Sequence, residues 1–89
     1  MKNQLNSLRK QIDILDNNLL KILAKRFQMV KKIGQLKKKL NLSTFDKKRF
    51  DDVLKTRISK AQQLGLSNDL IKKIYNIIHE EALEIEKSV

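Results

Sequence analysis

One apolar stripe from Leu5 to Leu40 constrains the fold more than any other feature. Most of its members are three or four residues apart, at Leu5, Leu8, Ile12, Leu15, Leu19, Ile22, Leu23, Val30, Ile33 and Leu40. This spacing places them along one face of an α-helix. We therefore expect a first helix from about Asn3 to Leu40, which at 1.5 Å per residue is roughly 57 Å long.

A second amphipathic segment predicts a helix from about Asp46 to Leu64. Ser43 or Thr44 is the expected N-cap, and Gly65 is a natural residue to follow the helix end. The side chains expected to face inward are Phe50, Val53, Leu54, Ile58, Ala61 and Leu64.

A third helix is expected to run to about Lys87, with Ser67 or Asn68 as its cap. Its apolar set is Leu70, Ile71, Ile74, Tyr75, Ile77, Ile78, Ala82 and Ile85. Proline is absent, glycine occurs twice, and no segment has the alternation of a strand. The fold class is therefore all-α, with one long helix and two shorter ones in a single domain over residues 1–89.

The length of the chain points to a dimer. A chain of 89 residues buries a limited core. It has no cysteine for a disulfide, and His79, its only histidine, cannot build a histidine-based zinc site. The second and third helices are each about 30 Å long, so together, folded back side by side, they cover only half of the first helix. We expect a second copy to cover the remainder, in an intertwined homodimer that shares its long helices.

The net charge of +10 indicates an anionic partner. Nucleic acid, an anionic membrane surface and a small acidic metabolite all fit this charge. Only four of the 20 basic residues are arginine, whose guanidinium offers carboxylates a rigid two-pronged donor. We see no signal peptide and no run of the roughly 20 apolar residues that a membrane span needs, so we expect a cytoplasmic protein.

Two cations interrupt the apolar stripe, at Arg26 and Lys37, where its spacing calls for leucine. They project from nearly the same side of the helix, roughly 16 Å apart along its axis. Either their stems pack while their charged ends reach water, or an anionic ligand pairs with them. Arg9 lies about 25 Å from Arg26 along the same helix, so only in an antiparallel dimer can Arg9 of one chain approach Arg26 of the other.

Four further residues stand out in the sequence. Asp46 and Arg49 share a face of the second helix, although Asp46 alone fits an ordinary helix N-terminus. Gly34, in the middle of the first helix, suggests that something approaches the backbone closely there. We expect His79 at the surface or its boundary.

The ordered set of motifs matches a known family. Leu8-Arg9-x-x-Ile12-Asp13, Leu23-x-x-Arg26, Ile33-Gly34-x-x-Lys37, Asp46-x-x-Arg49, Val53-Leu54 and Gly65-Leu66 resemble the all-helical (type II) chorismate mutases over nearly the whole chain. The resemblance implies an intertwined dimer of three-helix chains that rearranges chorismate to prephenate. It implies neither a cofactor nor a metal.

The resemblance also implies roles for particular residues. Arg26 and the partner's Arg9 would hold the two carboxylates, and Lys37 would donate to the ether oxygen and to one carboxylate. Asp46 and Arg49 would hold the hydroxyl-bearing side of the substrate. Arg57 matches none of these positions, so we expect it to be structural or to face solvent.

Three positions depart from the family pattern. Phe50 stands where many members have a glutamate for the ring hydroxyl, and Ala82 stands where a serine often touches a carboxylate. Glu86 replaces a glutamine that donates to the ether oxygen. A carboxylate cannot donate a hydrogen bond, but a carboxylic acid can. We therefore expect activity to fall as rising pH removes the proton from Glu86, and to be retained in Glu86→Gln.

Two other functions stay open from the sequence. Isochorismate pyruvate lyase shares this fold and a basic pocket. A basic helical module that binds nucleic acid or a partner helix would suit residues 17–45, which contain no acidic side chain. Against the second, the chain has only four aromatic residues and few arginines, so we expect neither a nucleic-acid nor a membrane partner.

Overall fold

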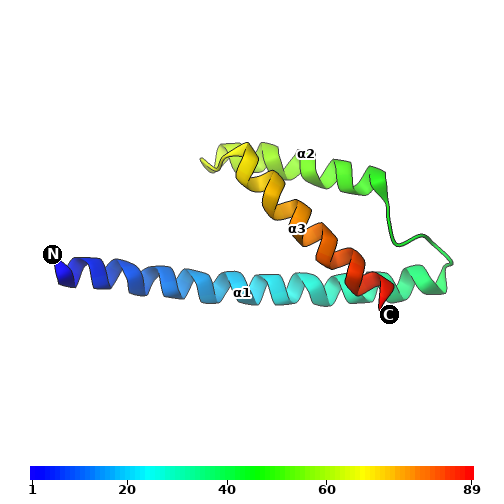
Figure 1. Ribbon diagram of the computed structural model, residues 1–89, viewed down its shortest axis with the longest axis horizontal. Coiled ribbons are helices and arrows are strands. Elements are labelled where there is room, and N and C mark those ends of the chain that lie inside the picture. The colour runs from blue at the N-terminus through cyan, green and yellow to red at the C-terminus, as the bar shows by residue number, and fades with distance from the viewer.

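The computed structural model describes all 89 residues and consists of three α-helices without a strand. They are α1 (Lys2–Lys39), α2 (Lys47–Gln63) and α3 (Asn68–Lys87) (Figure 1). The all-α class is confirmed. Each helix ends within one residue of the position that its apolar periodicity predicts.

The ends of α1 and α2 are set by residues in the left-handed region. Asn41 has φ 57° and Gly65 has φ 78°, a conformation that glycine and asparagine adopt most easily. The residue after each turns its N–H back to the last turn of the helix; the Leu66 N–H donates to the Ala61 carbonyl at 2.9 Å. Gly65 is thus confirmed as the residue that follows the end of α2.

The start of α2 differs from the prediction. Its N-cap is Asp46, an extended residue whose side chain accepts a hydrogen bond from the Arg49 N–H, and neither Ser43 nor Thr44 caps it. The carbonyl of Thr44 is engaged elsewhere, accepting a hydrogen bond from Lys37. At α3 the predicted cap is confirmed, because Ser67 accepts from the Leu70 N–H at 3.1 Å.

The helices form an open arrangement in which α3 is the central element. It packs against the C-terminal half of α1 on one side and against α2 on the other, whereas α2 and α1 do not pack together (Figure 1). The expectation that both shorter helices cover α1 is therefore wrong for α2. The link after α1 carries the chain away from α1 before α2 begins.

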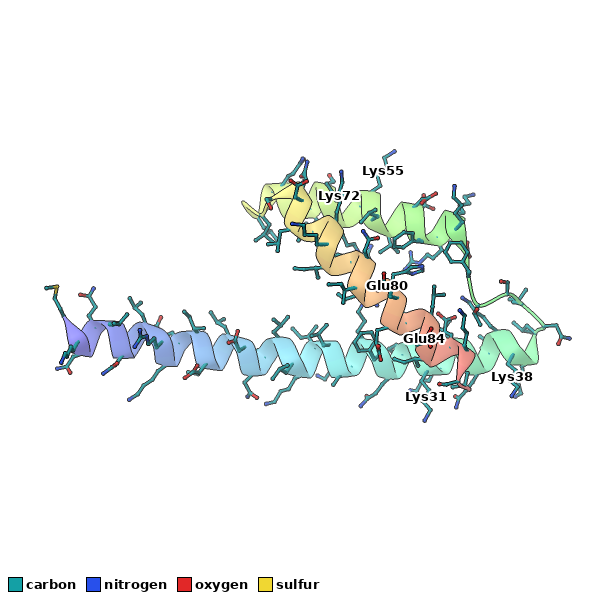
Figure 2. The ribbon with its side chains drawn as sticks, in the orientation of Figure 1. Lys31, Lys38, Lys55, Lys72, Glu80 and Glu84 are labelled. Atoms are coloured by element: carbon teal, nitrogen blue, oxygen red, sulfur yellow. The ribbon has the colours of Figure 1, made fainter.

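The N-terminal half of α1 is uncovered. Only six residues of the chain are buried, namely Val30, Gly34, Val53, Ala61, Ile71 and Ala82. Along the first half of α1, apolar side chains stay open to solvent; Leu15 is 64% exposed and Ile22 is 62% exposed. Figure 2 shows no other element over this half of the helix. A continuous apolar face of this extent marks an interaction surface.

Lysines cover much of the remaining surface. Lys31, Lys38 and Lys55 are exposed and project from the helices (Figure 2). None of the three helices is both long enough and apolar enough to cross a membrane.

Candidate active site

A pocket of about 290 Å³ lies where the three helices converge, and side chains from α1, α2, α3 and the first link form its wall. Its size is close to the lower end of small-ligand pockets. All six site residues that the sequence predicted within one chain line it: Arg26, Lys37, Asp46, Arg49, Ala82 and Glu86. Arg9 does not reach this pocket, because it lies on the uncovered half of α1.

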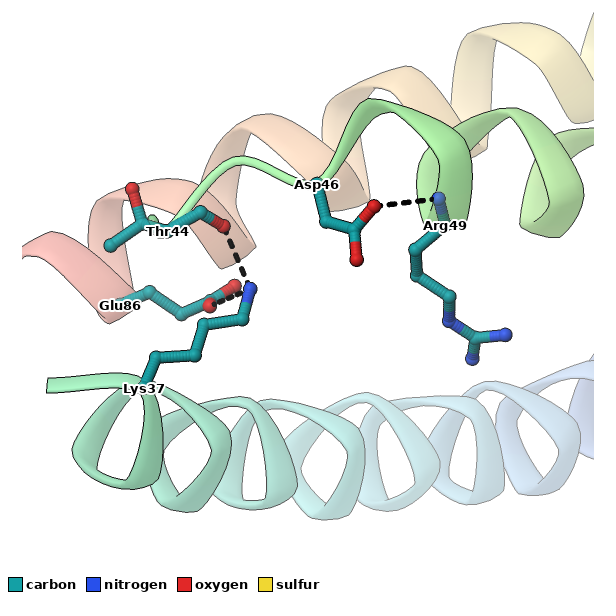
Figure 3. A network of polar contacts seen from close by, with 5 residues as sticks. All are labelled: Lys37, Thr44, Asp46, Arg49 and Glu86. Atoms are coloured by element: carbon teal, nitrogen blue, oxygen red, sulfur yellow. Dashed lines mark hydrogen bonds and ion pairs between the residues drawn. The ribbon is translucent and has the colours of Figure 1, made fainter. Parts of the chain in front are cut away.

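Lys37 connects α1 to α3 and to the link between α1 and α2 at one end of the pocket. Its Nζ lies 2.7 Å from Oε1 of Glu86 and donates to the Thr44 carbonyl at 2.8 Å (Figure 3). An ammonium group has three N–H donors, so one donor of Lys37 is left for a ligand. The side chains are largely buried, with 20% of Lys37 and 9% of Glu86 exposed, which strengthens the attraction between them.

Gly34 sets the distance between α1 and the end of α3. A Cβ on Gly34 would lie 2.9 Å from the Cα of Glu86, 3.2 Å from its Cγ and 2.9 Å from a methyl group of Val89. Carbon atoms pack without repulsion at about 3.5–4.0 Å, so only glycine allows this approach. The predicted close approach at Gly34 is confirmed, and the element that approaches is the turn of α3 that carries Glu86.

Asp46 and Arg49 bring α2 into the site. Oδ1 of Asp46 accepts from the Arg49 backbone N–H at 3.0 Å, which fixes the first turn of the helix. The Arg49 side chain extends from α2 towards α1 (Figure 3). Asp46 is thus both the cap of α2 and part of the pocket wall.

The pocket carries positive charge that the chain does not neutralise. Its wall contains four cations, Arg26, Lys37, Arg49 and Arg57, and two carboxylates, those of Asp46 and Glu86. The two ion pairs of the chain are Lys37–Glu86 and Lys47–Asp51, so no arginine of the pocket is paired with a carboxylate. The excess of two positive charges matches a ligand with two negative charges.

Arg26 is held by an aromatic ring. Its guanidinium carbon lies 5.9 Å from the centre of the Tyr75 ring, a cation–π contact that orients the group without using its N–H donors. Arg26 is half-buried and lines the pocket.

Two basic residues of the pocket, Arg57 and His79, were not predicted as site residues. Arg57 was expected to be structural or to face solvent, yet it lines the pocket, where its Nη1 donates to Thr56 Oγ1 at 2.9 Å. His79 is half-buried, as expected for a boundary residue, but it also lines the pocket. Helical spacing gave a weak signal for Arg57, since it lies two turns beyond Arg49 on the same face of α2.

His79 stacks on Phe50, with the ring centres 4.0 Å apart and the planes at 23°. Burial lowers the pKa of His79 below its ordinary 6.5; Glu86 opposes this shift, and Lys37 and Arg26 add to it. The imidazole is therefore neutral at pH 7. No group of three or more histidine, cysteine or acidic side chains is arranged to hold a metal ion.

Residues 8–87 match the family model described as chorismate mutase type II. No solved structure matches the chain significantly.

Curated relatives of two lengths match the chain. The T-protein of Enterobacter agglomerans is 34% identical over 83 residues, which cover 93% of this chain and 22% of that protein. The bifunctional chorismate mutase/prephenate dehydratase of Buchnera aphidicola subsp. Baizongia pistaciae is 33% identical over 87 residues, covering 98% of this chain and 24% of that protein. The chain thus spans about a quarter or less of these two relatives. The chorismate mutase of Methanocaldococcus jannaschii is 30% identical over 87 residues, covering 94% of this chain and 87% of that protein.

Proposed function

The chain belongs to the type II chorismate mutase family, and on this premise we propose that it rearranges chorismate to prephenate. The observation that carries the proposal is the charge of the pocket: two excess positive charges on groups that converge from three helices. Chorismate is a dicarboxylate, so its charge is opposite in sign to that excess.

The reaction asks little of the protein in covalent terms. One ether carbon–oxygen bond breaks and one carbon–carbon bond forms within the same molecule, so no proton or group passes to the protein. The protein holds the side chain of the substrate over the substrate's ring, and it stabilises the charge that develops on the ether oxygen. A rate increase of about 10⁶ corresponds to about 8 kcal/mol of transition-state stabilisation.

Arg26 and Lys37 have the central roles. The Arg26 guanidinium, oriented by Tyr75, binds one carboxylate through two parallel N–H donors. The third donor of Lys37 points to the ether oxygen, where negative charge grows as the bond breaks. Asp46 and Arg49 hold the hydroxyl-bearing side of the substrate from α2, and the small Ala82 leaves room on the α3 side.

Glu86 acts as a donor to the same ether oxygen when it is protonated. In the structure Oε1 of Glu86 forms an ion pair with Nζ of Lys37, at 2.7 Å.

The second carboxylate is held by the partner's Arg9 in an intertwined homodimer. The uncovered apolar face of α1 supports this arrangement, since it continues from the helix half that carries Arg9 towards the pocket. A second copy of the chain covers this face, because the uncovered α1 face of that copy offers a matching apolar stripe under two-fold symmetry. Light scattering at micromolar concentration tests this; a monomer would contradict it.

The activity is tested by following the loss of chorismate absorbance with purified protein at about pH 5.5 and about pH 7.5, and by analysing the products. Prephenate, formed faster at the lower pH, is the expected result. Release of pyruvate from isochorismate, without prephenate from chorismate, would replace the mutase by a lyase. DNA binding that weakens steeply with salt would favour a nucleic-acid module instead. A cytoplasmic location and a single domain over residues 1–89 remain predictions of the sequence.

A further inference from the structure

His79 contacts two aromatic rings. Phe50 stacks on its imidazole at 4.0 Å, and the Phe45 ring lies 5.6 Å from it at an angle of 57°. These contacts fix the orientation of the imidazole, and its place in the pocket wall brings it into reach of a ligand there.

Nε2 of His79 is a buried nitrogen without a hydrogen-bond partner. Buried polar atoms in folded proteins nearly always have a partner, because leaving one unpaired destabilises the fold. A leucine at this position would pack against Phe50 without leaving a buried polar atom unpaired. His79 also lines the pocket, so a ligand that binds there is the available source of the missing partner.

Burial keeps the His79 ring neutral, because it lowers the pKa of the imidazole. Burial favours the uncharged form, as do Lys37 and Arg26, while Glu86 and Glu80 oppose it. A neutral imidazole has one donor and one acceptor nitrogen. A hydroxyl group also donates and accepts, whereas a carboxylate only accepts and is better held by the arginines.

We propose that His79 is a specificity-determining residue whose imidazole exchanges a hydrogen bond with a hydroxyl group of the bound dicarboxylate. This inference rests on the proposed function for the identity of the ligand class. It explains why the ring that stacks on Phe50 is an imidazole. The arginines recognise the two carboxylates, and His79 selects ligands that also carry an alcohol.

The test compares two unreactive oxabicyclic dicarboxylates, one with a secondary hydroxyl and one without it, by titration calorimetry. With His79→Leu we expect the affinity for the hydroxyl ligand to fall about 3- to 10-fold, the range for one neutral hydrogen bond. The affinity for the deoxy ligand should change less than about 2-fold, since no hydrogen bond is lost. His79→Gln, which keeps a donor and an acceptor, should restore part of the loss.

A residue that only packs against Phe50 would give a different pattern. His79→Leu would then change the affinity for both ligands equally, and that outcome overturns the proposal. Circular dichroism of each variant checks that the helices are intact.

A second measurement needs no variant. His79 is the only histidine, so its imidazole nitrogen signals in NMR are unambiguous. Saturation with the hydroxyl ligand should shift the Nδ1 or Nε2 resonance, and the deoxy ligand should shift it much less. Identical spectra with the two bound ligands would contradict the proposal.

The two proposals fail in distinguishable ways. If wild-type protein binds neither dicarboxylate, the proposed function and the role of His79 are both wrong. If it binds both ligands, turns over chorismate and shows no preference that depends on His79, only the present inference is wrong.

Discussion

The substitution Gly34→Ala sets two physical effects against each other. Alanine stabilises the interior of a helix by about 1 kcal/mol relative to glycine, so α1 alone would become more stable. The added methyl group, however, would lie 2.9 Å from the Glu86 Cα and 2.9 Å from the Val89 side chain. Reaching ordinary contact distances of about 3.5–4.0 Å requires a shift of roughly 0.6–1 Å.

That shift falls on Glu86, which we propose as a donor to the ether oxygen. The Cα of Glu86 is backbone and cannot rotate away, so the last turn of α3 must move outward and carry its carboxyl group from Lys37. Misplacement of a reacting group by about 1 Å can reduce a rate by about 10²-fold. We therefore expect kcat to fall about 10- to 100-fold, with a smaller change in KM because Arg26 and Arg49 lie elsewhere.

The matched control is Gln35→Ala, the next residue along α1, whose side chain is exposed. It changes helix propensity without adding an atom at the α1–α3 contact. Steady-state kinetics on chorismate and thermal unfolding of both variants are the assays. A Gly34→Ala protein with wild-type kcat and a raised Tm would refute the reasoning, because helix propensity would then be the only role of this position.

Three further predictions concern other residues of the site. In Glu86→Gln, activity should change little between about pH 5.5 and about pH 7.5 while wild-type activity falls, because an amide donates a hydrogen bond at either pH; parallel pH profiles would count against the donor role. The pKa of His79 is lowered in the folded protein, so the unfolded chain binds this proton more readily. The contribution of His79 to the free energy of unfolding should therefore be full above about pH 6.5 and decline as pH falls towards the folded-state pKa. Chemical unfolding should show this decline weakened in His79→Leu, and equal slopes would contradict it. Asp46→Ala should cost about 1 kcal/mol by loss of the cap, and Asp46→Asn much less; equal losses in urea unfolding would mean that charge and not capping matters.

The three helices follow from the sequence because their causes are local. Apolar residues three and four apart define each helical face, and Gly65 needs no tertiary contact to end α2. The close approach at Gly34 could also be predicted. A glycine in mid-helix is unfavourable, so its presence suggests that a neighbour leaves no room for a Cβ. The approach of Glu86 to that backbone is the reason.

The features that the sequence did not predict depend on the path of the link between α1 and α2. Whether Ser43, Thr44 or Asp46 caps α2 is decided by which residue is extended at the helix start, and Thr44 is committed to Lys37. The same path holds α2 away from α1. That separation leaves room for the pocket, which Arg57 and His79 line. Spacing along one helix carries no information on how far away its neighbour lies.

The central claim is that a pocket in one chain is completed by Arg9 of the partner subunit. Arg26 and the partner's Arg9 are the two arginines proposed to hold the substrate carboxylates. Arg9→Ala and Arg26→Ala each remove one of this pair from both sites of a homodimer, so each protein alone should be nearly inactive. When the two variants are unfolded and refolded together, half of the dimers combine one chain of each kind. Such a dimer has one site with both arginines and one site with neither.

The decisive measurement is the chorismate mutase activity of that refolded mixture. The account predicts recovery to about a quarter of the wild-type activity, since half of the dimers carry one intact site of two. A mixture no more active than the average of its two components would contradict the shared site.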